Sequence, residues 1–219
     1  MNFDLATPHG MWRDLWIPAM GEHLVWAAGF SAAVGQIQGL TEGQVKAGLA
    51  AYRPAAMRQN TRKLGGITLI EDCYNAAPES MRAALRVLHL TAAETAAETA
   101  AETAADAPSA RRIAVLGDMK ELGANTEALH RVVGAEVVRQ GVDLLVAVGD
   151  LGRFIAEGAL EAGLPAEAIR YVSGIEDYPA AARWLAEEVR AGDTLLFKAS
   201  RAMALEKVAE AFCAHLNQE

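Results

Sequence analysis

The chain has 219 residues, of which 52% are hydrophobic, and its formal net charge at pH 7 is −8. This length and composition allow one large domain with a sizeable core. The acidic balance argues against nonspecific binding to nucleic acid or to an anionic membrane surface, both of which require basic patches. A nucleotide is not excluded, because it needs only a local cation and backbone N–H groups.

Targeting signals and reactive cysteine patterns are absent from the sequence. No basic region followed by an apolar run stands at the N-terminus, and no apolar stretch is long enough to span a bilayer, so we expect neither a signal peptide nor membrane insertion. Cys73 and Cys213 have no metal-like spacing, and a reduced, cytoplasmic setting is the simplest interpretation.

The first 57 residues contain few strand signals. A short extended piece is expected near 11–18, followed by an Ala/Gly-rich apolar helix over roughly 22–38 and a second helix in TEGQVKAGLAAY, with Thr41 as its N-cap. We expect this segment to be too small for a core of its own. We also expect the 22–38 helix to pack on the rest of the chain or against another chain.

From Gly66 onward, short apolar runs alternate with longer stretches of helical spacing. Such alternation predicts an α/β fold, a Rossmann-like and mostly parallel sheet with helices on both faces. The expected strands are 66–72, 112–118, 142–150, 168–173 and 193–200. The expected helices are 78–90, 125–140, 151–162, 176–191 and 203–216.

A strict four-residue repeat, TAAETAAETAAETAAD, occupies residues 91–106. It places Glu94, Glu98, Glu102 and Asp106 on one helix face, where like charges repel mildly, while its alanines favour helix. We interpret residues 91–108 as a low-complexity insertion, either a solvated extension of the 78–90 helix or a mobile loop.

Each expected strand ends in a polar residue: Asp72, Asp118, Asp150, Ser173 and Ser200. Ligands of open α/β sheets bind outside the carboxyl ends of the strands, so these positions are expected to rim the site. The alternative is that they cap the helices that follow, and we favour capping for Asp150 and Ser173.

The stretch IEDCYNAAPES links the strand at 66–72 to a helix that begins near Pro78. Asp72 is suited to accept hydrogen bonds from ribose hydroxyls, Tyr74 to stack on a base, and the helix start offers N–H groups to an anion. An ordinary strand–loop–helix cap remains the alternative.

Two further groups of polar residues follow strands. GDMKELG, residues 117–123, combines carboxylates, a lysine and glycines in a loop suited to bend around a ligand, with His130 downstream as a further candidate or a satisfied helix residue. FKASRAM, residues 197–203, brings Lys198, Ser200 and Arg201 to the end of the last strand. Two cations beside a hydroxyl suit a carboxylate or a phosphate, unless they form a charged strand exit in solvent.

The sequence contains no G-x-x-x-x-G-K-[S/T], H-E-x-x-H, G-x-S-x-G or C-x-x-C motif. It therefore has no P-loop for the β- and γ-phosphates, and a nucleotide site built here would be half a site.

These motifs resemble those of the Mur ligase family, and within it the ligases that join D-alanyl-D-alanine to UDP-N-acetylmuramoyl-tripeptide. DCYNAAPESM at 72–81 resembles D-S-Y-N-A-N-P-x-S-M, and 117–123 resembles G-D-M-x-E-L-G with His130 at the matching downstream position. KASR at 198–201 resembles K-G-S-R, Gly21-Glu22-His23 resembles G-x-H, and Arg58 resembles the arginine that opens the family's C-terminal domain.

The resemblance implies an ATP-dependent ligase of peptidoglycan precursor synthesis that works through an acyl phosphate. It implies that residues 1–57 are the end of a central ATP-binding domain and that 58–219 form the C-terminal Rossmann-like domain. The P-loop and Mg²⁺ would belong to the central domain, so this chain would be inactive alone and hold no catalytic or metal-binding residue. The implied nucleotide-binding residues are Arg58, Asp72, Tyr74, Asn75 and His23. The implied substrate-binding residues are Lys198, Ser200, Arg201, Asp118, Glu121 and His130.

Four departures from the family pattern replace an asparagine or a glycine. Ala27 and Ala77 stand where the family has asparagines, and Met57 and Ala199 stand where it has glycines. Each lost amide removes a hydrogen bond worth about 1 kcal/mol. The alternative hypothesis is therefore a degenerate, non-catalytic binding module of the same fold that acts with a partner protein.

Overall fold

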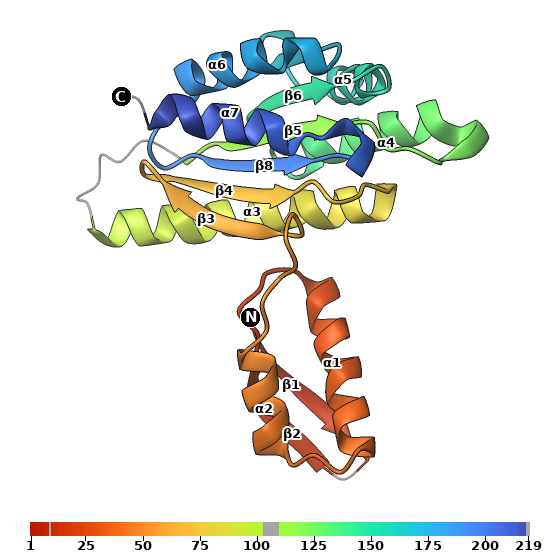
Figure 1. The fold of residues 1–219 in the computed structure, drawn as a ribbon, viewed down its shortest axis with the longest axis vertical. Helices are drawn as coiled ribbons and strands as arrows, with labels where there is room; N and C mark the ends of the chain where they lie inside the picture. Colours follow the sequence, from red (N-terminus) through yellow and green to blue (C-terminus); the bar gives the residue numbers. More distant parts are fainter. Residues whose placement is uncertain (9, 103–109, 218–219) are drawn as a thin grey trace. The chain divides into compact units, whose positions relative to one another are not determined.

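The computed structural model describes residues 1–8, 10–102 and 110–217, with only the backbone described for 98–102 (Figure 1). The chain divides into two compact units, residues 1–55 and 56–219. The assignment of the first segment to a larger ATP-binding domain stays a prediction.

The first unit is a β-hairpin with two helices. Strands β1 (Asn2–Thr7) and β2 (Gly10–Trp16) pair antiparallel, and helices α1 (Glu22–Ile37) and α2 (Glu42–Ala50) follow. The buried apolar side chains form a small cluster: Leu15, Ile17, Ala28, Ala32, Val45 and Leu49. The expectations of no separate core and of a single extended piece were wrong, because the hairpin supplies an apolar surface to the two helices.

The two helices of this unit follow the sequence signals. Thr41 caps α2 as predicted: its hydroxyl accepts the Gln44 N–H at 3.3 Å, and the Gln44 side-chain oxygen accepts the Thr41 N–H at 2.9 Å. Helix α1 exposes a row of large apolar side chains, Trp26, Phe30, Val34 and Ile37. That the rest of the chain or another chain packs on this row stays a prediction.

The second unit is built on a six-stranded sheet with the order β3-β4-β8-β5-β6-β7. Its strands are β3 (Asn60–Leu64), β4 (Ile67–Asp72), β5 (Arg112–Gly117), β6 (Leu144–Val148), β7 (Ile169–Val172) and β8 (Thr194–Lys198). All neighbours pair parallel except β3 and β4. This confirms the predicted mostly parallel α/β fold.

The antiparallel edge strand β3 was not predicted. Its residues NTRKL are mostly polar and have no buried side chain, so they carry no apolar strand signal. Gly65 and Gly66 join it to β4 with φ angles of 57° and 78°. A Gly-Gly pair with both φ angles positive is typical of a two-residue hairpin turn. The Gly-Gly pair was therefore the one feature of the sequence that could have predicted β3.

Helices cover both faces of the sheet (Figure 1). They are α3 (Pro78–Glu102), α4 (Thr126–Arg139), α5 (Gly152–Glu161), α6 (Tyr178–Glu188) and α7 (Glu206–Leu216). Helices α6 and α7 pack on one face, where Phe212 lies 6.3 Å from Phe197 of β8 between ring centres. Helices α3, α4 and α5 lie on the other face.

Helix α3 is longer than predicted because it continues into the TAAE repeat as far as Glu102. Thr91 and Ala92 are buried, so the repeat begins as part of the packed helix. Asp106 and the end of the repeat lie outside the described residues, and the insertion interpretation stays a prediction.

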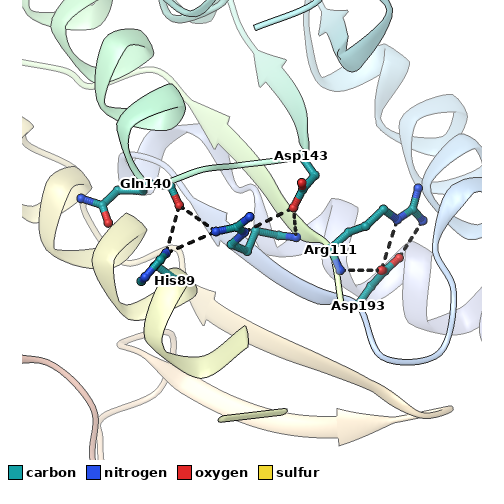
Figure 2. Close-up of polar contacts among 6 residues, drawn as sticks. His89, Arg111, Gln140, Asp143 and Asp193 are labelled. Atoms are coloured by element: carbon teal, nitrogen blue, oxygen red, sulfur yellow. Dashed lines mark hydrogen bonds and ion pairs between the residues drawn. The ribbon is translucent and has the colours of Figure 1, made fainter. Parts of the chain in front are cut away.

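A group of ion pairs fixes the amino ends of the central strands (Figure 2). The Asp193 carboxylate accepts the Arg111 backbone N–H at 3.1 Å and pairs with its guanidinium at 2.7 Å. The Asp143 carboxylate similarly accepts the Arg112 backbone N–H at 2.8 Å and lies 3.3 Å from its Nε. These pairs hold the starts of β5, β6 and β8 in register, at the end of the sheet opposite the loops that follow the strands.

Candidate functional site

The loops that follow β4, β5, β6 and β8 meet at the carboxyl edge of the sheet, as a parallel sheet requires. Direct hydrogen bonds join them. The Ser200 N–H donates to the Asp118 carbonyl at 3.0 Å, and the Lys120 N–H donates to the Ser200 hydroxyl at 2.9 Å. The Lys198 ammonium donates to the Asn75 carbonyl of the loop after β4, so the three motifs singled out in the sequence form one connected edge.

Lys198 and Asp72 form a buried ion pair at the start of this edge. The Lys198 ammonium lies 2.7 Å from Asp72 Oδ2 and donates to the Asn75 carbonyl at 2.8 Å. Lys198 is 2% exposed, and the other Asp72 oxygen accepts the Gln59 N–H at 3.3 Å. Sequence reasoning placed both residues at the edge but did not foresee that they would bind each other.

Arg58 and Tyr74 form an exposed platform beside that pair. The Arg58 guanidinium lies 4.0 Å from the centre of the Tyr74 ring, and Tyr74 is 44% exposed. The Tyr74 N–H donates to the Met57 carbonyl at 3.1 Å, which ties the segment before β3 to the loop after β4. A stacked cation and ring offer a flat surface suited to an aromatic or anionic ligand group.

Asp118 is buried and ties two loops to the end of α5. Its Oδ1 accepts the N–H groups of Leu151 and Gly152 at 3.0 and 2.8 Å, and its Oδ2 lies 2.8 Å from the Lys120 ammonium. The carboxylate thus satisfies the amino end of α5. Capping by Asp150 was favoured from the sequence, but Asp118 performs it.

His130 is completely buried in α4, and both ring nitrogens have partners. Its Nε2 accepts the Met119 N–H at 3.0 Å, and its Nδ1 lies 2.6 Å from the Thr126 carbonyl. Burial lowers the pKa of His130, while the Thr126 carbonyl and Asp118 oppose this shift. In this conformation the ring has no nitrogen left for a ligand.

The loop after β8 exposes one strong cation, Arg201. Its side chain is 52% exposed and pairs with Glu206 at 2.6 Å. The Tyr178 hydroxyl of α6 donates to the Met203 carbonyl at 2.7 Å and so fixes the turn that follows Arg201. Burial raises the pKa of Tyr178 to about 12, so its hydroxyl stays protonated as a donor.

Two glycines permit the close approach of these loops. A Cβ on Gly149, whose φ is +93°, would lie 2.5 Å from the Asp118 carboxylate. A Cβ on Gly117 would lie 2.8 Å from that of Ala199. Ala199, which replaces a family glycine, is therefore accommodated because Gly117 has no side chain.

The predicted site residues thus divide by accessibility. Those that solvent reaches at this edge are Arg58, Tyr74, Asn75, Glu121 and Arg201. Asp118, His130, Lys198 and Ser200 are buried, and Asp72 is largely enclosed. Sequence reasoning did not select Lys120, whose side chain is 44% exposed beside Asp118. His23 is exposed on α1 in the other unit.

Two departures from the family pattern lie in well-defined surroundings. Ala27 lines a mostly apolar cavity of about 280 Å³ between α1 and α2, with Leu24, Gln44 and Tyr52 among its other walls. The Ala77 N–H donates to the Ser80 hydroxyl at 3.0 Å at the start of α3. An asparagine at either position would add an amide that alanine does not supply.

The cysteines and the possible metal ligands of the described residues add no further candidate site. Both cysteines are free and buried, and burial raises the pKa of Cys73 to about 12, which keeps its thiol protonated. Within the described ranges, no three His, Cys, Asp or Glu side chains gather into a possible metal site, and we assign no metal ligand to them. No helix among the same residues is both long and apolar enough to cross a bilayer.

Residues 89–201 match the family model for the Mur ligase glutamate ligase domain. The chain belongs to the Mur ligase family. It is 32% identical over 203 residues to a UDP-N-acetylmuramoyl-tripeptide–D-alanyl-D-alanine ligase of Bacillus subtilis, covering 92% of this chain and 40% of that relative. It is 36% identical over 230 residues to the ligase of the same name from Mycobacterium bovis, covering 96% and 43%.

Solved structures agree with this assignment to the Mur ligases. The crystal structure of MurF from Acinetobacter baumannii superposes with a TM-score of 0.77 at 27% identity, covering 97% of this chain and 42% of that one. A MurF ligase from Thermotoga maritima shares the fold, with a TM-score of 0.72 at 23% identity over 98% and 43% of the two chains. This Mur ligase chain thus spans less than half the length of these relatives.

Proposed function

We propose that this chain is the C-terminal portion of a cytoplasmic, ATP-dependent ligase that adds D-alanyl-D-alanine to UDP-N-acetylmuramoyl-tripeptide. The observation that carries the proposal is the alignment of more than nine tenths of the chain with relatives of that name at 32% and 36% identity. The loops that hold the three sequence motifs meet at one edge of the sheet, which supports a ligand site there.

In this proposal the exposed residues contact the ligands and the buried ones hold the loops. Arg201 is the best-placed cation for the carboxylate of the incoming dipeptide, with Lys120 from the neighbouring loop as a second. The Arg58–Tyr74 platform faces the nucleotide. The buried Lys198–Asp72 pair and Asp118 keep these contacts in place.

In this proposal the tripeptide carboxylate takes the γ-phosphoryl group of ATP and ADP is released. The dipeptide amine then attacks the acyl phosphate, which forms the amide bond and releases phosphate and a proton. The sequence contains no P-loop motif, so we assign the ATP phosphates and Mg²⁺ to the portion that the longer relatives have in addition. We expect the 219-residue chain alone to show no ATP-dependent ligation. Robust turnover by the purified chain would contradict this part of the proposal.

Calorimetric titration of the chain with D-alanyl-D-alanine, and separately with ATP, tests the ligand assignments. We expect saturable dipeptide binding that is lost or greatly weakened in Arg201→Ala. Arg13→Ala removes an exposed arginine in the first unit and is the matched control, which should bind as the wild type does. Absence of dipeptide binding, or equal binding by Arg201→Ala, would refute the assignment.

A second function is favoured by the alanines at 27 and 77. These remove two side-chain amides expected in the family, and a degenerate binding module that acts with a partner protein would tolerate their loss. This alternative predicts a stable partner in pull-downs with the purified chain and no dipeptide binding. Saturable dipeptide binding without any stable partner would exclude it.

A further inference from the structure

We propose that His130 is a positioning residue that holds the loop of Lys120 and Glu121 in its ligand-facing conformation, as a neutral imidazole protonated on Nδ1. The Met119 backbone N–H can only donate, so Nε2, at 3.0 Å, must be the acceptor. The Thr126 carbonyl can only accept, so Nδ1, at 2.6 Å, must carry the proton. These two contacts permit one tautomer alone.

The contact acts at the centre of the loop. Met119 is buried, and the next residue, Lys120, donates its N–H to Ser200 and places its ammonium beside Asp118. Glu121 follows with a φ of 65°, a left-handed conformation that a non-glycine residue holds only when its surroundings enforce it. Through Met119, the ring fixes the direction in which the exposed side chains of this loop point.

Protonation of the ring would oppose this arrangement. A proton on Nε2 would face the Met119 N–H, so the charged ring cannot keep the contact. The charged groups that act on His130 are Asp118, which raises its pKa, and Lys120, which lowers it, and burial is the largest effect and lowers it from the ordinary 6.5. The folded state therefore binds its proton less readily than the unfolded chain. The contribution of neutral His130 to the stability of the folded state is therefore complete above about pH 6.5. It decreases as the pH falls toward the lowered pKa of the ring.

NMR spectroscopy of the 219-residue chain tests the tautomer and the contact without any ligand. We expect His130 to carry its proton on Nδ1 at pH 7, and Met119 amide exchange, corrected for its intrinsic pH dependence, to accelerate as the ring becomes protonated. A proton on Nε2, or ring protonation that leaves Met119 exchange unchanged, would overturn the proposal.

Substitutions separate positioning from general stability. His130→Phe keeps a flat ring but has no acceptor, and should accelerate Met119 exchange about tenfold while leaving the amide of Val146 in β6 protected. His130→Gln restores an acceptor and should recover most of the protection. Equal loss of protection at Met119 and Val146, or no recovery with glutamine, would contradict a positioning role. If the phenylalanine variant does not fold, the wild-type tautomer and pH dependence decide the question.

The expected effect of His130 on ligand binding rests on the proposed function, and it is measured separately, as the dissociation constant for the dipeptide. We expect the dissociation constant for D-alanyl-D-alanine to rise about tenfold in His130→Phe and to recover in His130→Gln. Unchanged affinity in a phenylalanine variant with accelerated Met119 exchange would refute the link between loop and ligand. If the wild-type chain does not bind the dipeptide, the proposed function fails, whereas the tautomer and exchange results still test the positioning of the loop.

Discussion

Lys198 and Asp72 illustrate how a motif residue can serve the fold before it serves a ligand. A lysine that is 2% exposed is tolerated because its ammonium meets a carboxylate at 2.7 Å and a backbone carbonyl at 2.8 Å. Removing one partner of such a pair leaves a buried charge without compensation, which costs far more than the pair itself contributes.

We therefore expect Lys198→Met to lower the free energy of unfolding by about 3–5 kcal/mol, because Asp72 would be left unpaired. The double variant Lys198→Met/Asp72→Asn removes both charges and should lose less than the two single variants combined. Urea denaturation measures all three. A loss below about 1 kcal/mol in Lys198→Met, or strict additivity in the double variant, would contradict a coupled buried pair.

Met57 holds a strained backbone at the junction before β3. Its φ of 59° lies in the left-handed region, which costs a residue with a Cβ about 1–2 kcal/mol. The Met57 carbonyl accepts the Tyr74 N–H at 3.1 Å, so this conformation also positions the platform residue.

We expect Met57→Gly to be more stable than Met57→Ala by about 1 kcal/mol, because both variants lose the methionine side chain but only glycine relieves the strain. Thermal denaturation of the two variants measures the difference. Equal melting temperatures would show that the left-handed backbone carries no such strain.

At the scale of elements, helices α4 and α5 approach so closely that their backbones touch. A Cβ on Gly134 would lie 2.2 Å from the Ile155 carbonyl, and a Cβ on Gly158 would lie 2.3 Å from the Arg131 carbonyl. Neither obstacle is a side chain that could rotate away, so only glycine fits at these crossings. Helix α4 carries His130, so the packing of α4 on α5 also affects the position of this candidate-site residue.

We expect Gly134→Ala to lower the free energy of unfolding by about 1–3 kcal/mol by forcing the helices apart. Gly48→Ala, in α2, is the control: a Cβ there meets nothing within 4 Å, and alanine should be neutral or stabilising by up to about 1 kcal/mol. Chemical denaturation compares the two. A Gly134→Ala variant as stable as Gly48→Ala would refute the close crossing.

The sequence predicts elements well where burial is continuous and poorly where it is partial. All five parallel strands were located within two residues at each end, because they are apolar runs bounded by glycine or polar residues. Strand β3 was missed because its mostly polar residues face solvent at the sheet edge, where only the Gly65-Gly66 turn marks it. Strand β1 was missed although Phe3 and Leu5 alternate with exposed residues at the period of a half-buried strand.

For the candidate site, the sequence predicted the position of the loops but not the partners of the residues in them. Motifs at strand ends correctly predicted the edge where the loops meet, because chain order and parallel pairing alone decide it. They could not show that Asp118 caps α5 or that His130 binds Met119, since those partners lie 33 and 11 residues away along the chain. Whether a polar residue faces a ligand or another part of the chain depends on packing, which spacing does not encode.

For the molecule as a whole, the alignments with the two ligases include 92–96% of this chain but only 40–43% of each relative. We therefore expect the proposed ligase activity to require the part of those relatives that lies outside the alignment. The buried ion pair, the capping carboxylate and the His130 contact give the second unit a defined edge for that role.

The most direct test is a chimaera in which this chain replaces the aligned part of the Bacillus subtilis ligase, 40% of that protein. We expect ATP-dependent addition of D-alanyl-D-alanine to UDP-N-acetylmuramoyl-tripeptide by the chimaera, and a large loss of that activity when Arg201 is changed to alanine within it. A folded chimaera that binds ATP but forms no product would contradict the proposed ligase function and favour the non-catalytic binding module.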